Sequence, residues 1–286
     1  MFLQTIVDGI MLGGLYAIIG MGLAVVFGTM RIINFAHGQF VMVGMYISYA
    51  CFQFLHIDPY LSIGISFVIS FLLGILVFRL TLKPILHAPE MNHILLTAGL
   101  GLMLTNLSQM VFNTNQLTVN LPYGHHTIHF LHVEVNQAYL LSFIIAGFVA
   151  LFLFLFMLKT ETGRSIRAIS QNSSSSALMG IPVNRITTLV FGLGIAIAGV
   201  AGTLLLPVHY VDPSVGDSFS LLAFIIVVLG GMGSIFGAGI GGILIGLIWS
   251  LSSFYLGGSY GDVLTYIMFL LVLLLKPSGL FGRSRV

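Results

Sequence analysis

Charged side chains are scarce in this chain. Of its 286 residues, ten are lysine or arginine and eight are aspartate or glutamate, so 6% are charged and 58% are hydrophobic. A soluble globular domain carries about 25% charged residues. So few charges cannot cover a water-exposed surface, and the mean hydropathy of +1.09 agrees with this. The composition excludes a soluble enzyme and a free nucleic-acid-binding protein, and it indicates a membrane protein.

Cysteine and lysine are also rare. Cys51 is the single cysteine, which excludes an intramolecular disulfide and a cysteine-based metal or redox motif. None of the lysines (Lys83, Lys159 and Lys276) follows a Gly-x-x-x-x-Gly pattern, so the sequence has no P-loop for ATP. No Ser–His–Asp or paired-carboxylate pattern indicates hydrolysis. We therefore expect a protein that is not an enzyme and holds no cofactor or metal. Its energy source must be an ion gradient or a partner protein.

Long uncharged stretches predict an all-α polytopic membrane protein, because a helix crosses the hydrocarbon core with about 20 apolar residues. The stretch 218–261 is too long for one span. It contains the glycine-rich turn Gly230–Ser234, so we divide it into a short or re-entrant segment and a full one. The nine expected segments are Gly9–Thr29, Gly38–Ile57, Leu61–Phe78, Met91–Phe112, Ala138–Leu158, Ile186–Pro207, 219–232, 235–256 and 260–275. Glycines at four-residue spacing predict close helix packing within the subunit, and we expect one transmembrane domain over residues 1–286.

The positions of the basic residues predict the orientation of the chain. With the N-terminus outside, alternation of the nine segments puts all ten basic residues on the cytoplasmic side and six of the eight acidic ones outside. The C-terminus and the segment 159–185 then lie in the cytoplasm, and the loop 113–137 lies outside.

The predicted outer loop is rich in histidine. Its histidines are His125, His126, His129 and His132. Clusters of imidazole groups can bind zinc, but this loop has no cysteine and only Glu134 as a nearby carboxylate. We therefore expect a polar surface loop here rather than a metal site.

Two polar breaks follow apolar helices and resemble each other weakly. The first expected helix ends at Phe27-Gly28, a polar stretch follows up to Gly38, and a new helix begins there. The sixth ends at Pro207, and residues 208–216 precede the next apolar run. In the predicted topology the first unit runs inward and the second runs outward. Inverted repeats with broken helices are typical of transporters, in which the breaks form the substrate site.

The residues that we expect along a substrate path lie at these breaks. They are Asn34, His37, Gly38, Gln39, Asp212, Ser214 and Gly216. A helix that begins at a break presents unpaired N–H groups and the positive end of its dipole, which suit a passing carboxylate. Asn34 and His37 would offer hydrogen bonds to the substrate. In the alternative, which stays open here, these two side chains only satisfy backbone groups that the break exposes.

The segment 159–185 is the longest one expected in the cytoplasm, and it is amphipathic. Up to Gln171 its isoleucines and arginines fall on different helical faces, and a second short helix, capped by Asn172 or Ser173, is expected to end at Gly180. Such a helix pair can dock into a groove of a partner protein. It can equally be a solvated linker whose charges set the topology, and the composition does not decide between the two.

Four motifs occur in order along the chain. They are INFAHGQ at 33–39, a segment at 163–181, AF…VLGGMGS…G at 223–237, and KPSGLFG at 276–282. Together they resemble the LivH-type permease of branched-chain amino acid ABC transporters, and the second motif is similar to its coupling loop. The residues that this resemblance implies for coupling to an ATPase are Gly163, Arg164, Arg167, Gln171, Ala177, Leu178, Gly180 and Ile181. The run Ser173–Ser176 departs from the charged residues and alanines usual in the family and lowers helix propensity there.

The resemblance implies a permease subunit of a binding-protein-dependent importer in the bacterial inner membrane. Its substrates would be branched-chain or other hydrophobic and neutral amino acids, and ATP hydrolysis on partner subunits would drive it. The implied partners are a LivM-like permease, two cytoplasmic ATP-binding subunits and an extracytoplasmic amino-acid-binding protein.

Other functions fit the same composition. Relatives of the same architecture import urea or short amides, so the substrate stays open. An ion-coupled secondary amino acid carrier needs a carboxylate within the membrane. We expect none there, because Asp262, near the start of the segment 260–275, is counted among the six acidic residues outside. A passive channel does not explain the patterned cytoplasmic segment.

Overall fold

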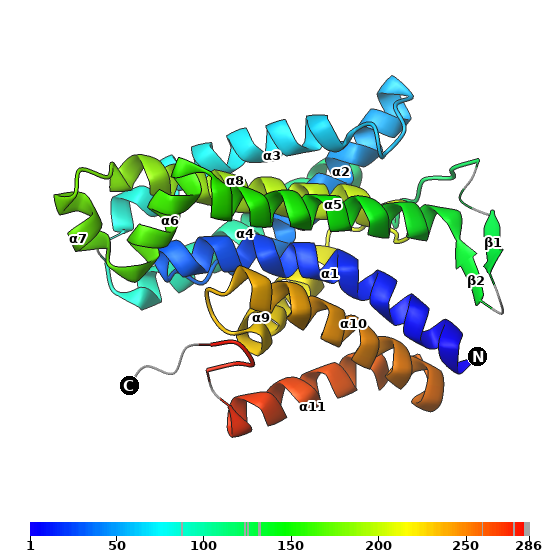
Figure 1. The fold of residues 1–286 in the computed structure, drawn as a ribbon. Helices are drawn as coiled ribbons and strands as arrows, with labels where there is room; N and C mark the ends of the chain where they lie inside the picture. Colours follow the sequence, from blue (N-terminus) through cyan, green and yellow to red (C-terminus); the bar gives the residue numbers. More distant parts are fainter. Residues whose placement is uncertain are drawn as a thin grey trace.

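Helices make up almost all of the computed structural model, which describes residues 1–86, 88–122, 124, 126–130, 133–258, 260–276 and 278–282 (Figure 1). The helices are α1 (Phe2–Met30), α2 (His37–Leu55), α3 (Ile63–Val77), α4 (Glu90–Phe112), α5 (Gln137–Lys159), α6 (Glu161–Gln171), α7 (Ser173–Leu178), α8 (Val183–Leu205), α9 (Val215–Gly230), α10 (Ile235–Leu256) and α11 (Tyr260–Leu275). A π-helical turn (Phe78–Leu82) and a 3-10 turn (Lys83–Ile85) extend α3. The strands β1 (Thr127–Phe130) and β2 (Val133–Asn136) form an antiparallel hairpin.

The nine membrane segments expected from the sequence are confirmed as helices. Seven of them, with α3 counted through Ile85, are long and apolar enough to cross a membrane. Two others, α9 and α11, are shorter apolar helices of 16 residues each. These findings confirm an all-α, multi-pass membrane protein.

The expectation that no acidic residue lies inside a segment is wrong. Asp8 lies in α1, Asp217 in α9 and Asp262 in α11, and Glu90 is the first residue of α4. Asp262 already lay within the expected segment 260–275. The other three enter helices that extend beyond the uncharged stretches, because a helix continues past one polar side chain when its backbone hydrogen bonds are satisfied. The structure thus places three carboxylates at helix positions that hydropathy alone leaves in the loops.

The helices run between two ends of the molecule (Figure 1). The hairpin and the start of α1 lie at one end, and α6 and α7 lie at the other. We call the latter the basic end. The basic residues of the described chain occur in the segments that meet there: Arg31, Arg79, Lys83, Lys159, Arg164, Arg167, Arg185 and Lys276. Their common location agrees with the predicted orientation, whereas the assignment of this end to the cytoplasm stays a prediction.

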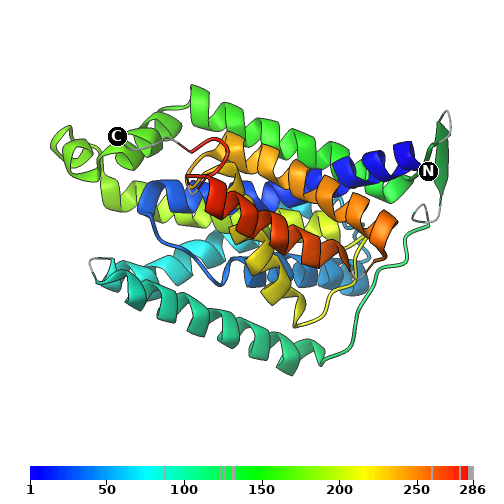
Figure 2. The same cartoon turned by 90° about the horizontal axis from the view of Figure 1, so that it is seen from below.

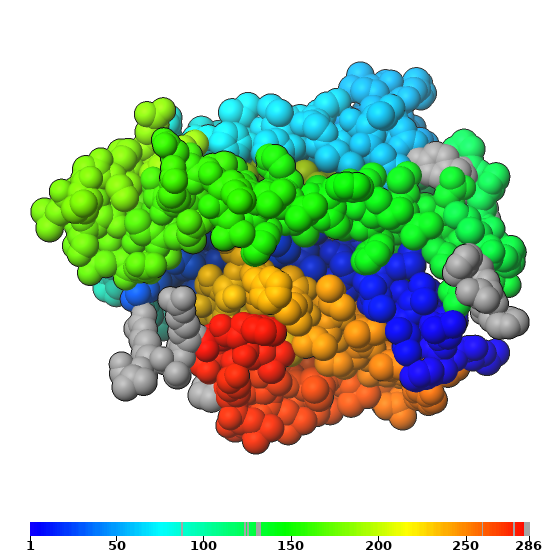
Figure 3. Space-filling view, viewed as in Figure 1, coloured from blue at the N-terminus to red at the C-terminus, as the bar shows by residue number. Residues whose placement is uncertain are grey.

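The centre of the bundle is formed by α1 and α8, and α3, α5, α10 and α11 cover much of one face (Figure 3). A Cβ atom on Gly13 of α1 would lie 2.6 Å from Ile243 Cα of α10. One on Gly202 of α8 would lie 2.0 Å from Val41 O of α2. The backbones therefore touch at positions where only glycine fits. The expectation that these small-residue stripes pack within the subunit is confirmed.

The two broken-helix units repeat one packing scheme, in which α1–α4 correspond to α8–α11. The first helix of each unit packs on the third helix of the other unit: α1 on α10, and α8 on α3. The second helix of each unit packs on the first helix of the other: α2 on α8, and α9 on α1. Within each unit the fourth helix packs on the second: α4 on α2, and α11 on α9. Since α1 starts at the hairpin end and α8 starts at the basic end, the two units run in opposite directions (Figure 1). This exchange of contacts agrees with the inverted repeat expected from the sequence.

Candidate functional site

Arg31 and Asn34 shape the break between α1 and α2. Arg31 takes the left-handed conformation, with φ 56°, and donates its N–H to Phe27 O, which ends α1. Asn34 Oδ1 accepts the N–H of Ala36 at 3.1 Å, and Asn34 O accepts the N–H of His37 at 3.1 Å. The chain thereby returns along the bundle before α2 begins (Figure 2).

Asp212 shapes the break between α8 and α9. Its Oδ1 accepts the N–H of Ser214 at 2.7 Å, the hydroxyl of Ser214 at 2.6 Å, and the N–H of Val215 at 3.0 Å. The carboxylate therefore satisfies N–H groups at the start of α9, as a helix cap does. For this reason α9 begins at Val215, earlier than the expected position near 219.

The starts of α2 and α9 lie against each other. A Cβ atom on Gly38 would lie 2.1 Å from Gly216 O, so the two backbones touch. The N–H of Gly38 donates to Ser220 Oγ at 2.9 Å. Gln39 Nε2 donates to Asp217 Oδ1 at 2.6 Å, and Ser220 Oγ donates to Gln39 Oε1 at 3.0 Å. This contact, which we call the helix-start contact, joins the two halves of the repeat at their breaks.

Sequence reasoning missed Asp217 and Ser220 at the helix-start contact. The signal that could have identified Asp217 is an acidic residue in the first turn of an apolar helix, where the helix dipole favours negative charge. No local pattern marks Ser220, because its role comes from a partner 181 residues away.

Asn34 and His37 are buried, with exposed fractions of 2% and 0%. The His37 ring faces α1, where its Nε2 lies 3.1 Å from Ile19 O and where a Cβ atom on Gly22 would lie 3.3 Å from its Cε1. Asn34 Nδ2 and His37 Nδ1 have no hydrogen-bond partner among the described residues. Each side chain thus satisfies one backbone group and keeps one unpaired polar atom, which is uncommon for buried groups.

A cavity of about 260 Å³ lies beside the start of α9. Asp212 and Ser214 line it, together with Asp262 and Trp249, whose Nε1–H donates to Asp262 Oδ1 at 2.9 Å. The other aromatic side chains in its wall are Tyr16, His209, Tyr210, Phe219 and Tyr266. Carboxylates beside aromatic faces suit an ammonium group, through charge attraction and cation–π contact. The predicted path residues therefore fall into three places: this cavity, the helix-start contact, and the buried positions of Asn34 and His37 at the first break.

The coupling segment begins with α6, which is anchored to the bundle. Thr160 Oγ1 accepts the N–H of Gly163 at 2.9 Å and caps the helix. A Cβ atom on Gly163 would lie 2.4 Å from Met157 O, so α6 approaches the end of α5 closely. Ile166 and Ile169, only 5% and 3% exposed, pack into the hydrophobic core. The predicted apolar face is thus confirmed.

The polar face of α6 is exposed, and one of its arginines also reaches the end of α5. Arg164 Nη2 lies 3.3 Å from Glu161 Oε1, and both side chains are exposed. Arg167 donates from Nη1 to Met157 O and so ties α6 to the last turn of α5. Gln171, the last residue of α6, is exposed. The expected separation of arginine and isoleucine faces is therefore confirmed.

The second helix of the coupling segment ends in an exposed apolar tip. Asn172 is the cap, and its Oδ1 accepts the N–H of Ser175 at 2.9 Å. This cap starts a helix in spite of the run Ser173–Ser176. Leu178 and Met179 are 89% and 83% exposed. Two large apolar side chains therefore project from the basic end of the molecule.

The comparison with known proteins decides the family. Residues 5–273 match the family model described as branched-chain amino acid transport system / permease component. The chain belongs to this family. The resemblance to LivH-type permeases stated above is thereby confirmed.

Individual permeases match over nearly their whole length. The chain is 32% identical to the high-affinity branched-chain amino acid transport system permease protein LivH of Escherichia coli (strain K12), over 100% of this chain and 97% of the relative. It is 29% identical, with the same coverage, to the high-affinity permease protein BraD of Pseudomonas aeruginosa. It is 30% identical to the probable permease protein LivH of Methanocaldococcus jannaschii, over 98% of this chain and 92% of the relative. No solved structure matches the chain.

In this permease the histidine-rich loop includes the β1–β2 hairpin, which sequence reasoning did not foresee. His129 Nδ1 lies 3.5 Å from Glu134 Oε1, and both side chains are exposed. Gln4 of α1 exchanges two hydrogen bonds of 2.8 Å with the backbone of Glu134, which fixes the hairpin to the start of α1. His125 and His132 lie outside the described residues. Within the described part, no three metal-binding side chains form a group.

Proposed function

We propose that this chain is the permease subunit of a binding-protein-dependent ABC importer in the bacterial inner membrane. Its substrates are branched-chain or other hydrophobic and neutral amino acids, and it has no enzyme activity of its own. The partners are a LivM-like permease, two cytoplasmic ATP-binding subunits that hydrolyse ATP, and an extracytoplasmic amino-acid-binding protein. The names of the full-length relatives support the substrate class. The lack of a P-loop in the sequence supports ATP hydrolysis on a separate subunit.

The observation that carries this proposal is the exposed tip at Leu178 and Met179. α6 supports this tip through its buried isoleucines, so it is presented on a fixed base. Apolar side chains exposed on an anchored helix pair favour insertion into a groove of a partner protein. We infer that residues 177–181 enter a groove of the ATPase, and that the exposed polar face of α6 meets its rim. A solvated linker would not need two large apolar side chains at its most exposed point.

The substrate path of this proposal passes the helix-start contact. The carboxylates of Asp212 and Asp262 attract the ammonium group of an amino acid into the cavity beside α9. In the state described, the hydrogen bonds of Gln39 hold the starts of α2 and α9 together and close the path. Separation of the two starts breaks these hydrogen bonds while both helices stay intact. Gly38 and Gly216 permit the closed contact because neither has a side chain.

Transport in reconstituted vesicles tests the function. The permease is combined with its partner permease, the ATPases and the binding protein, and the uptake of radiolabelled leucine, isoleucine and valine is measured. We expect uptake that requires ATP and the loaded binding protein. Uptake of urea or acetamide instead would contradict the substrate class. Leucine uptake driven by a proton gradient, without the ATPases, would indicate a carrier and would overturn the importer.

Two variants test the path separately. Asn34→Ala and His37→Ala are expected to lower uptake strongly, because each removes a polar atom that is unpaired in the closed state. ATP hydrolysis stimulated by the binding protein should persist, since the coupling segment is unchanged. Ser70→Ala, which removes a buried unpaired hydroxyl on α3 away from both breaks, is the matched control. Uptake at the Ser70→Ala rate in both variants would remove these residues from the path.

A further inference from the structure

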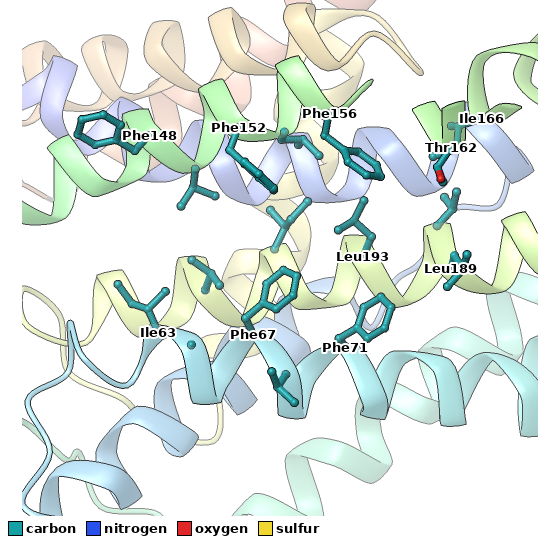
Figure 4. Close-up of a pocket in the computed structure, with 17 residues that line it drawn as sticks. Ile63, Phe67, Phe71, Phe148, Phe152, Phe156, Thr162, Ile166, Leu189 and Leu193 are labelled. Carbon is teal, nitrogen blue, oxygen red and sulfur yellow. The ribbon is translucent and has the colours of Figure 1, made fainter. Parts of the chain in front are cut away.

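α3, α5 and α8 enclose a groove along one side of the bundle, with a cavity volume of about 820 Å³ (Figure 4). The wall formed by α3 carries Ile63, Phe67 and Phe71, and α8 forms the floor. The wall formed by α5 carries phenylalanines at 148, 152 and 156. Among the described residues that line it, Thr162 is the single one with a polar side chain, and it lies at the basic end. The groove is therefore apolar over its whole length.

This groove opens sideways, toward the position of the lipid hydrocarbon. Phe148 and Phe152 on its rim are each 68% exposed, and Val68 on the opposite rim is 53% exposed. The floor is closed, since Val190 and Val200 are 0% and 2% exposed. Ordered water is not stabilised in such a groove, because the walls offer it almost no hydrogen-bond partners. An apolar occupant from the membrane is favoured instead.

The dimensions of the groove select among apolar occupants. Its floor runs from Leu189 to Val200, which at 1.5 Å per residue is about 16 Å along α8. This is about half of the ~30 Å hydrocarbon core, the depth of a single leaflet. Over the groove's length of about 16 Å, a transmembrane helix about 10 Å wide fills roughly 1250 Å³, about one and a half times the cavity volume. A lipid acyl chain is slender enough for this space, and a helix of a partner is not.

Two cations lie just beyond the lining residues at the basic end, on two of the helices that form the groove. Lys159 follows the three phenylalanines of α5 on one stripe of the helix, at successive spacings of four, four and three residues. Arg185 precedes Leu189 by one turn on α8. Both cations are exposed, and neither side chain forms a hydrogen bond or ion pair with another described residue. Basic side chains at the mouth of a groove between membrane helices attract an anionic lipid headgroup.

We propose that this groove binds one anionic phospholipid, with an acyl chain along α8 and the headgroup phosphate at Lys159 and Arg185. The apolar walls supply the affinity for the chain, and the two cations supply the preference for negative charge. The lipid fills the space between the walls, α3 and α5, over the floor formed by α8. It thereby stabilises the packing of these helices next to the coupling segment. This inference does not depend on the transported substrate.

Native mass spectrometry of the full chain in mild detergent tests the proposal. Dioleoylphosphatidylglycerol and dioleoylphosphatidylcholine are titrated separately, so that the probes differ only in headgroup. We expect one phosphatidylglycerol molecule to stay bound under conditions that strip phosphatidylcholine. Gly64→Phe should abolish this adduct, because Gly64 lines the groove and a Cβ atom there meets nothing within 4 Å. The matched control is Gly147→Phe, at an equally open glycine of α5 outside the lining, and it should keep the lipid.

The headgroup contact is tested by the double variant Lys159→Gln, Arg185→Gln. Each cation near the surface contributes a factor of about five, so the preference for phosphatidylglycerol over phosphatidylcholine should fall roughly 25-fold. An unchanged preference would refute the headgroup site. Equal lipid retention in the Gly64→Phe and Gly147→Phe variants would refute the groove site. A Phe152→Cys variant that cross-links to a partner subunit in membranes would show a protein occupant and would also overturn the proposal.

Discussion

Replacement of Gly38 by alanine is expected to destabilise the protein, because the new methyl group drives α2 and α9 apart. A Cβ atom there would lie 2.1 Å from both Gly216 O and Ser220 N. Ordinary contact begins at 3.4 Å, so the facing backbone must retreat by about 1.3 Å (3.4 − 2.1). Overpacking of this kind costs about 1–3 kcal/mol. Loss of the hydrogen bond from the Gly38 N–H to Ser220 Oγ adds about 1 kcal/mol.

The sum, about 2–4 kcal/mol, is large enough to measure. It corresponds to a fall in melting temperature of roughly 5–15 °C for a chain of this size. The melting temperature is measured by size-exclusion chromatography of detergent-purified protein after heating. Gly99→Ala in α4 is the control, because a Cβ atom there meets nothing within 4 Å. If Gly38→Ala and Gly99→Ala melt at the same temperature, the starts of α2 and α9 do not touch as described. The proposed closed state of the path then fails.

Three further predictions concern the coupling tip, the topology and the helix-start contact. Gly180→Trp should leave the protein in the membrane but abolish co-purification with the ATPases, because a large ring alters the turn after the exposed tip. Retained ATPase binding and normal uptake would contradict the docking role. In a Cys51→Ser background, cysteines at His126 and Ser174 should react with an impermeant thiol reagent from opposite sides of the membrane, and labelling from one side would refute the nine-segment topology. The Gln39→Glu variant should melt at a clearly lower temperature than Gln39→Met, because it replaces a 2.6 Å hydrogen bond to Asp217 by repulsion between two carboxylates. Equal melting temperatures would show that Asp217 does not face this position.

Local features of this protein could be predicted from the sequence because they depend on neighbouring residues. The nine segments follow from runs of apolar side chains, and the two faces of α6 follow from its helical period. Asn172 caps α7 because its side chain reaches an N–H three residues later. The early start of α9 had a local signal as well, since Asp212 precedes Ser214 and Val215 in a capping pattern that hydropathy does not register.

The pairing of distant segments was decided only by the tertiary structure. Gly38 and Gly216 lie 178 positions apart, and nothing in either break specifies that they touch. The burial of His37 against α1 and the groove between α3, α5 and α8 likewise depend on which helix faces meet. In a soluble protein the apolar face of a helix marks its buried side. In a membrane, faces that contact lipid and faces that contact protein are equally apolar, so helix partners are selected by close fit at small residues and by hydrogen bonds between helices.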